Sequence, residues 1–269
     1  MLILSLAAAT TAKATLIVII PAKGATVVCA DRKFLATDGR QFDSDDKLQL
    51  LSPHALFFVV GLEAVSTEGK ILFAPGTIFR RFLAEQAAEG IPSGIAIQDS
   101  AKIGEYLRDA FEKFLRENKF PPPKSLPFEL QPGFELGILR MENHLPSLTI
   151  LKVSQDGNEP FATSGFVPVI DHFFSRSDPM YLGQLDVVLS IAKQDARFSR
   201  FFTDPYVHEF ILTNFGKPLT NPATALKAAR RLISVTADGL RTLPRPVASV
   251  SKESVCAVMD YSNDTAQYR

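Results

Sequence analysis

One continuously apolar run at residues 16–20, Leu-Ile-Val-Ile-Ile, constrains the fold more than any other stretch of this chain. A strand with one face in water alternates apolar and polar residues, whereas this run has no polar position. We therefore predict a strand that is buried on both faces. Strand-like segments follow at residues 24–33, 45–51 and 57–61, and we therefore expect the fold to be organised around residues 15–61.

Four chemically distinct residues stand at the ends of these segments. They are, in chain order, Thr15, Asp31, Lys47 and Gly61, at steps of sixteen, sixteen and fourteen residues. Because buried strands hold their ends rigidly, a hydroxyl, a carboxylate and an ammonium at such ends are expected to converge within hydrogen-bonding reach. Each residue alone has an ordinary structural explanation, such as a strand former, a turn residue or a solvated lysine. The joint spacing favours a catalytic site.

This spacing resembles the catalytic framework of proteasome β-type subunits and their bacterial relatives, which are N-terminal-nucleophile hydrolases. In that family the chain opens on a threonine, an acid follows a Gly-Val-Val-x-Ala-Ala-Asp strand, and a lysine and a glycine come later. The segment Gly24-Ala-Thr-Val-Val-Cys-Ala-Asp31 is similar to that strand, with one residue more between glycine and acid. The resemblance covers the first third of the chain closely, and beyond it the order of elements agrees.

The residue types and the resemblance together imply a role for each position. A threonine hydroxyl is a poor nucleophile until a base takes its proton, and a chain that begins at Thr15 supplies that base through its own α-amine. Lys47 would supply the positive charge that keeps this amine neutral, and Asp31 would orient the lysine. The backbone N–H of Gly61 would donate to the developing oxyanion. A distal aspartate of the family corresponds by a loose match to Asp238, in the sequence Thr-Ala-Asp-Gly.

The chain also departs from the family pattern. The glycine before the family's threonine is Ala14 here, and Leu16 follows where the family has a further threonine. This change argues against release of the threonine by the chain itself, and a signal peptidase would take that role. The arginine two residues after the acid is Lys33, which keeps the charge. The distal Ser-Gly-Ser segment is not recognisable, and Leu182-Gly-Gln184 lies near its place.

The first fourteen residues decide whether the chemistry is available. They are apolar, then small, and they end in Ala12-Lys-Ala14, a pattern that signal peptidase reads. The segment is short and lacks a basic region, so an ordinary chain terminus explains it equally well. We expect residues 1–14 to be removed and residues 15–269 to form a single domain. Removal by signal peptidase implies a periplasmic or secreted protein, and the alternative is a cytoplasmic one.

Composition excludes several function classes. Basic and acidic residues balance at 29 each, which argues against a nucleic acid or an anionic membrane as the main partner. The apolar runs after residue 21 are shorter than the ~20 residues of a membrane-spanning helix. Cys29 and Cys256 lie in apolar runs, where a cysteine is usually a small buried hydrophobe. The histidines are scattered, and we expect no metal and no cofactor.

The order of the remaining elements predicts the fold class. Helices are predicted at residues 78–83, 103–115, 181–197 and 223–237, and strands at residues 134–141, 148–153 and 255–261. A hairpin turn is expected at residues 52–54, N-caps at Asp99 and Asn221, and a stiff connector at the three prolines of residues 121–123. Strands, a helix pair, strands, a helix pair and a last strand suit an α+β fold, a four-layer αββα sandwich. The family resembled has the same architecture.

The leading prediction for function is amide-bond hydrolysis by Thr15, as in a threonine-type endopeptidase. The residues indicate the chemistry, and the resemblance implies that the substrates are peptides. A first alternative is a non-catalytic structural subunit of a proteasome-like assembly. A second is a small-molecule amidohydrolase, since one fold accommodates several substrates. The resemblance also implies a homo-oligomer that stacks through its helical layers, supported if helices 99–118 or 181–197 carry exposed apolar side chains.

Overall fold

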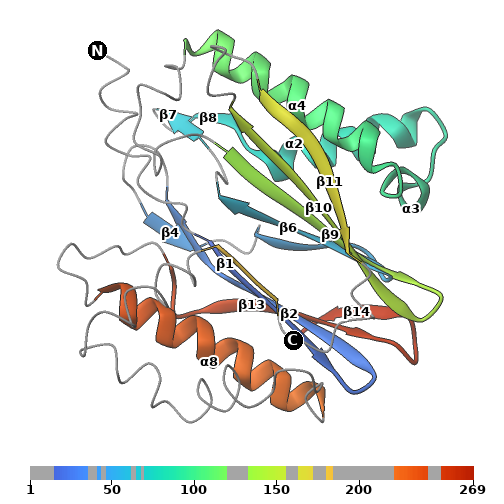
Figure 1. The fold of residues 1–269 in the computed structure, drawn as a ribbon, viewed down its shortest axis with the longest axis vertical. Coiled ribbons are helices and arrows are strands. Elements are labelled where there is room, and N and C mark those ends of the chain that lie inside the picture. Colours follow the sequence, from blue (N-terminus) through green and yellow to red (C-terminus); the bar gives the residue numbers. More distant parts are fainter. Residues whose placement is uncertain are drawn as a thin grey trace.

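Two five-stranded antiparallel sheets lie face to face at the centre of the molecule (Figure 1). The computed structural model describes residues 15–35, 41–43, 47–61, 65–67, 70–119, 133–155, 163–171, 180–183, 221–241 and 250–269. The first sheet has the strand order β12 (Met180–Gly183), β1 (Leu16–Ala22), β2 (Ala25–Asp31), β13 (Ser254–Asp260) and β14 (Thr265–Tyr268). The second has the order β11 (Thr163–Asp171), β10 (Leu145–Gln155), β9 (Gly133–Glu142), β6 (Ala55–Gly61) and β5 (Leu48–Ser52). Two short ribbons are formed by β3 (Lys33–Leu35) with β4 (Gln41–Asp43) and by β7 (Val65–Thr67) with β8 (Lys70–Phe73).

Helices cover the outer face of each sheet. The second sheet is covered by α2 (Pro75–Ala88), α3 (Ser93–Ala96) and α4 (Ser100–Glu117), and the first by α8 (Pro222–Arg241) (Figure 1). Among the described helices, none is long and apolar enough to span a membrane. The predicted four-layer αββα sandwich is confirmed.

Strand β1 is buried on both faces, as its unbroken apolar run predicts. Leu16, Val18 and Ile20 pack in the apolar layer beneath α8. Ile17 and Ile19 pack in the layer between the two sheets. The strand therefore lies in an inner layer of the sandwich, covered on both faces, where its first residues are held rigidly.

Local signals in the sequence set several element boundaries. The Asp99 side chain accepts a hydrogen bond from the N–H of Lys102 at 3.0 Å, and the Asn221 side chain accepts one from the N–H of Thr224 at 2.8 Å. Both residues are thus the N-caps that were expected. The hairpin predicted at residues 52–54 joins β5 to β6, with Ser52 opposite Ala55.

The structure corrects one helix prediction. The helix predicted at residues 181–197 is wrong at its start, because Met180–Gly183 form the strand β12. This strand pairs with β1, so that Gly183 lies opposite Leu16, and a ladder to a distant strand overrides the local helical spacing. Residues 184–197 lie outside the described residues, as do residues 1–14 and the three prolines at 121–123. Strand β11 occupies a segment whose sequence has no regular pattern.

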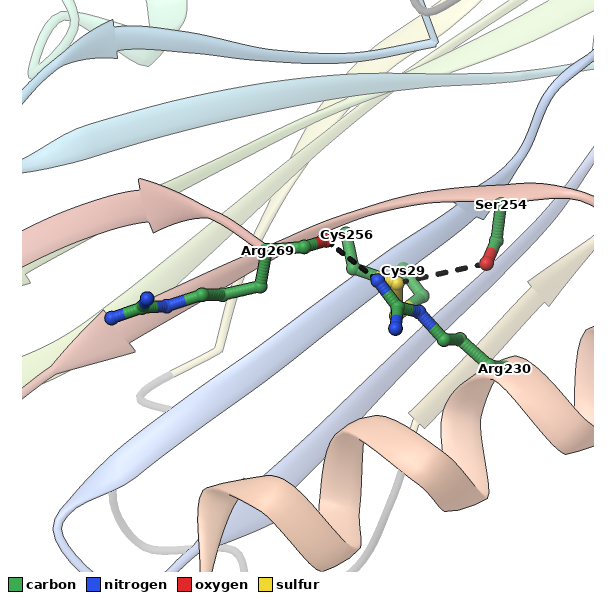
Figure 2. The surroundings of a disulfide bond; sticks show 5 residues. All are labelled: Cys29, Arg230, Ser254, Cys256 and Arg269. Atoms are coloured by element: carbon green, nitrogen blue, oxygen red, sulfur yellow. Dashed lines mark hydrogen bonds between the residues drawn. A yellow bond between two sulfur atoms is a disulfide. The ribbon is translucent and has the colours of Figure 1, made fainter.

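The two cysteines form a disulfide. Cys29 on β2 and Cys256 on β13 are directly opposite each other in the ladder, and both are buried (Figure 2). The burial was expected, whereas the bond was not. The sequence separation of 227 hides the bond in the sequence, because only the pairing of β2 with β13 brings the cysteines together.

Candidate active site

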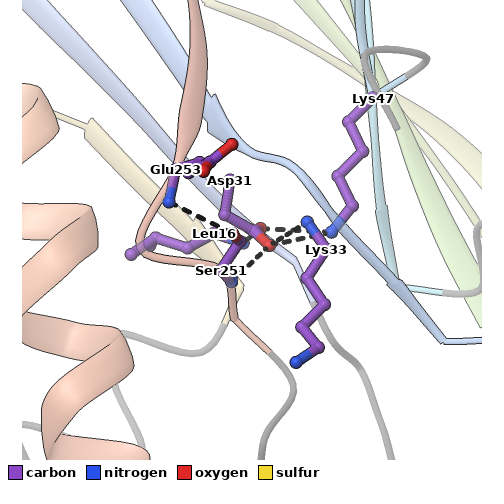
Figure 3. Close-up of polar contacts among 6 residues, drawn as sticks. All are labelled: Leu16, Asp31, Lys33, Lys47, Ser251 and Glu253. Carbon is purple, nitrogen blue, oxygen red and sulfur yellow. Dashed lines mark hydrogen bonds and ion pairs between the residues drawn. The ribbon is translucent and has the colours of Figure 1, made fainter. Parts of the chain in front are cut away.

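Asp31 and Lys47 form a buried ion pair, as the sequence predicts. Asp31 is the last residue of β2 in the first sheet, and Lys47 immediately precedes β5 in the second. The Lys47 Nζ atom lies 3.2 Å from Oδ1 and 3.1 Å from Oδ2 of Asp31 (Figure 3). The Asp31 side chain is 0% exposed and the Lys47 side chain is 2% exposed. The pair therefore ties the two sheets together at one end of β1.

Backbone N–H groups from three separate segments converge on the same carboxylate. Leu16 donates to Oδ1 at 2.8 Å, while Lys33 and Ser251 donate to Oδ2 at 3.0 Å and 3.2 Å (Figure 3). Burial raises the pKa of the Asp31 carboxyl above its ordinary value, and the Lys47 charge and the N–H groups of Leu16 and Ser251 oppose that rise. All these contacts come from donors, which suits the ionised carboxylate.

Thr15 is adjacent in sequence to a residue that is bonded to this ion pair. It precedes Leu16, whose N–H is bonded to Asp31, so the start of β1 is fixed at the carboxylate. Thr15 is 0% exposed, and within the described part of the chain its Oγ1 atom has no hydrogen-bond partner. A buried hydroxyl without a partner is costly unless another group uses it.

Gly61 ends β6, and its backbone explains why the residue is glycine. Its φ is +91°, and a Cβ atom at this position would lie 2.8 Å from the carbonyl oxygen of Gly133. Residues with side chains rarely adopt such a φ, and the close approach excludes them further. These constraints are structural, and the assignment of its N–H to an oxyanion stays a prediction.

The more distant candidates lie at the edge of this cluster. Asp238 is on α8, and its half-exposed side chain lies 2.5 Å from the Nζ atom of Lys252. Lys252 directly follows Ser251, whose backbone N–H donates to Asp31. Leu182 and Gly183 pair with Ile17 and Leu16, which places the segment near the start of β1, while Gln184 lies outside the described residues. A catalytic role for Asp238 stays a prediction.

Ser251 is the site residue that the sequence reasoning missed. It is 220 positions from Asp31, and it contributes through its backbone N–H. Backbone donors have no residue-type signature, so this contact becomes visible only once β13 is paired with β2. Within the described ranges, no group of three or more His, Cys, Asp or Glu residues is placed to hold a metal ion.

Two stacked sheets between helical layers, with a buried acid–lysine pair at the first residues of an inner strand, define a four-layer αββα sandwich. The fold is similar to that of solved structures of proteins named Anbu. Anbu (ancestral beta-subunit) from Yersinia bercovieri matches over 94% of this chain and 86% of that chain, with a TM-score of 0.52 and 11% identity. The Anbu (Gly-1) mutant from Hyphomicrobium sp. strain MC1 matches over 95% and 86%, with a TM-score of 0.49 and 13% identity.

The resemblance in the first third of the sequence thus extends to the fold of the whole chain. At identities this low, the likeness is one of fold. No family model and no curated protein matches the sequence.

Proposed function

We propose that this chain is an amide-bond hydrolase of the threonine type, which acts through Thr15 after residues 1–14 are removed. The observation that carries the proposal is the buried Asp31–Lys47 pair beside the start of β1. Burying two charges costs free energy of desolvation, and replacing a buried ion pair by well-packed apolar residues often leaves the stability of a protein unchanged or higher. A functional role for the ammonium explains why the pair is placed there.

The proposed reaction uses groups of this chain alone. The α-amine of Thr15 takes the hydroxyl proton as Oγ1 attacks the substrate carbonyl, and the Lys47 charge favours the neutral amine and the developing alkoxide. The amine then returns the proton to the leaving nitrogen, which leaves an ester on Thr15. Water, activated by the same amine, hydrolyses the ester and restores the hydroxyl. The N–H of Gly61 is the proposed donor to the oxyanion of both steps.

Removal of residues 1–14 is an essential part of this proposal. While Ala14 is joined to it, the nitrogen of Thr15 is an amide without usable basicity, so the general base does not exist. The complete burial of Thr15 in the full-length chain agrees with an inactive precursor. The signal-peptidase pattern at residues 12–14 offers a route for removal.

Mass spectrometry tests both parts of the proposal. Intact protein from the native host is expected to lack fourteen residues, and a chain that begins at Thr15 is expected to gain mass with an electrophile directed at N-terminal threonine. The variant Thr15→Ser keeps a hydroxyl and should still be labelled, while Thr15→Ala should not. Labelling of Thr15→Ala would rule Thr15 out as the nucleophile. A full-length native chain without label would favour the structural-subunit alternative, and hydrolysis of acylamides without peptides would favour the amidohydrolase.

We further propose that the chain assembles with copies of itself. The Yersinia bercovieri protein is a beta-subunit by its name, which motivates the proposal. Exposed apolar side chains on α4 would have supported stacking through that helix. Among the described residues, however, the exposed large apolar side chains are Ile95, Leu145 and Tyr268, and none of them lies on α4. An interface on α4 would therefore be polar. Light scattering decides the matter, and a monomer at high concentration would contradict assembly.

A further inference from the structure

Residues 250–253, which we call the strap, cross the Asp31 carboxylate just before β13 begins. At one end, the Val250 side chain is buried in the apolar layer beneath α8. In the middle, the N–H of Ser251 donates to Asp31 Oδ2 at 3.2 Å. At the other end, the carbonyl oxygen of Glu253 accepts from the N–H of Arg32 at 3.1 Å. The strap is thus fixed on both sides of the carboxylate that it crosses.

The Ser251 hydroxyl gives the strap its shape. It accepts a hydrogen bond from the N–H of Glu253 at 3.1 Å, which closes a turn over two residues (Figure 3). A turn of this kind fixes the backbone around its serine, and here it directs the N–H of Ser251 toward Asp31. Ion pairs between Glu253 and Arg32 at 3.0 Å and between Lys252 and Asp238 at 2.5 Å flank the turn.

The disulfide fastens the strap to the strand that carries Asp31. In the ladder between β2 and β13, Ser254 lies opposite Asp31, and Cys256 lies opposite Cys29. The covalent bond is therefore two residues from Asp31 on one strand and two residues from the beginning of β13 on the other. A shift of β13 along β2 would move the Ser251 N–H away from the carboxylate, and the bond prevents such a shift.

We propose that the strap is a positioning element of the candidate active site, in which Ser251 holds the Asp31 carboxylate in the orientation that binds Lys47, and the Cys29–Cys256 bond keeps the strap in register. The inference deepens the proposed function and rests on it for its catalytic meaning. The geometric part stands on the contacts of Asp31 alone. Ser251 is accordingly a positioning residue, which acts on the nucleophile through Asp31 and Lys47.

Titration of Asp31 in the full-length chain tests the geometric part without any need for activity. The ¹³C signal of the Asp31 carboxyl reports its pKa by NMR. In Ser251→Ala the turn loses its acceptor, the N–H donation weakens, and the Asp31 pKa should move upward, because that N–H opposes the rise caused by burial. Ser251→Thr keeps the hydroxyl and should restore the wild-type titration. Ser262→Ala is the matched control, since it removes a serine hydroxyl that bonds to Asp260 in the turn after β13.

A second set of variants separates the strap from the side chain of Ser251. Ser251→Pro deletes the N–H itself and should raise the Asp31 pKa at least as far as Ser251→Ala does. The double variant Cys29→Ala/Cys256→Ala, measured where it is folded, should shift the titration in the same direction. Wild-type titration in Ser251→Ala and Ser251→Pro, with the fold intact, would overturn the proposal.

Labelling of Thr15 in the processed chain then tests the catalytic part. Ser251→Ala should be labelled about tenfold more slowly than wild type, as expected for the loss of one hydrogen bond to a charged group, and Ser251→Thr should recover the rate. Absence of labelling in every form, together with a shifted Asp31 titration, would sink the proposed function and leave the positioning role of the strap in place. Wild-type labelling and wild-type titration in Ser251→Ala would instead sink the strap proposal alone.

Discussion

A lysine ammonium in a protein interior is tolerated where a carboxylate faces it and that carboxylate is itself hydrogen-bonded. Lys47 meets this condition, because Asp31 faces it at 3.1 Å and accepts three backbone N–H groups as well. Asp31 ends β2 in the first sheet and Lys47 precedes β5 in the second, so the ion pair also links the two sheets. Loss of one partner leaves the other as an uncompensated buried charge.

Replacement of Lys47 by methionine removes the charge and keeps a long side chain. We expect the free energy of unfolding to fall by about 3–5 kcal/mol, because the Asp31 carboxylate is left buried and unpaired. Urea denaturation followed by circular dichroism measures the change. The double variant Asp31→Asn/Lys47→Met should recover part of the loss, and a double variant no more stable than Lys47→Met would show that the carboxylate charge is not the cause.

Gly61 offers a second test at the level of single residues. Gly61→Ala meets both an unfavourable φ of +91° and a backbone oxygen 2.8 Å from the new Cβ atom. We expect a loss of about 2–4 kcal/mol in the free energy of unfolding. Gly24→Ala is the control, since Gly24 has a φ of +75° and nothing within 4 Å, and should lose about 1–2 kcal/mol. Equal losses in the two variants would show that the contact with Gly133 is harmless.

Single elements show how far the sequence alone can lead. Strand β1 and the helix caps at Asp99 and Asn221 were predictable, because their signals lie within a few neighbouring residues. The pair Asp31–Lys47 was predictable from spacing and resemblance together. Strand β12 was not, because its pairing with β1 overrides the local pattern. The Ser251 donor and the disulfide arise from the pairing of β13 with β2, which no local signal contains.

The contact of β14 with β5 yields a prediction about elements. The hydroxyl of Tyr268 donates to the carbonyl oxygen of Leu48 and accepts from the N–H of Leu50, at 3.2 Å and 3.1 Å, on the edge strand that follows Lys47. Tyr268→Phe should lower the free energy of unfolding by about 1 kcal/mol and speed hydrogen exchange at Leu50. Tyr106→Phe, which loses hydroxyl contacts between α2 and α4, should leave exchange at Leu50 unchanged. Unchanged exchange in Tyr268→Phe would contradict a role for this hydroxyl in holding β5.

On the scale of the whole molecule, the disulfide limits the freedom of the unfolded chain. It closes a loop across a separation of 227 residues, and a loop of that length gives a stabilisation of about 5 kcal/mol in the chain-entropy model. The double variant Cys29→Ala/Cys256→Ala should therefore unfold at a clearly lower temperature in calorimetry. A thermal midpoint equal to that of wild type would show that the bond adds nothing to the packing of β2 against β13.

The same bond makes residues 29–256 a closed covalent ring. One cut by a protease anywhere inside that ring opens it without separating the pieces, which remain joined through Cys29 and Cys256. A molecule nicked once should migrate as one species on a denaturing gel without reductant and as two fragments after reduction. For a chain proposed to act on peptide bonds, and so to meet other proteases, this means that a broken loop does not cost the molecule its integrity.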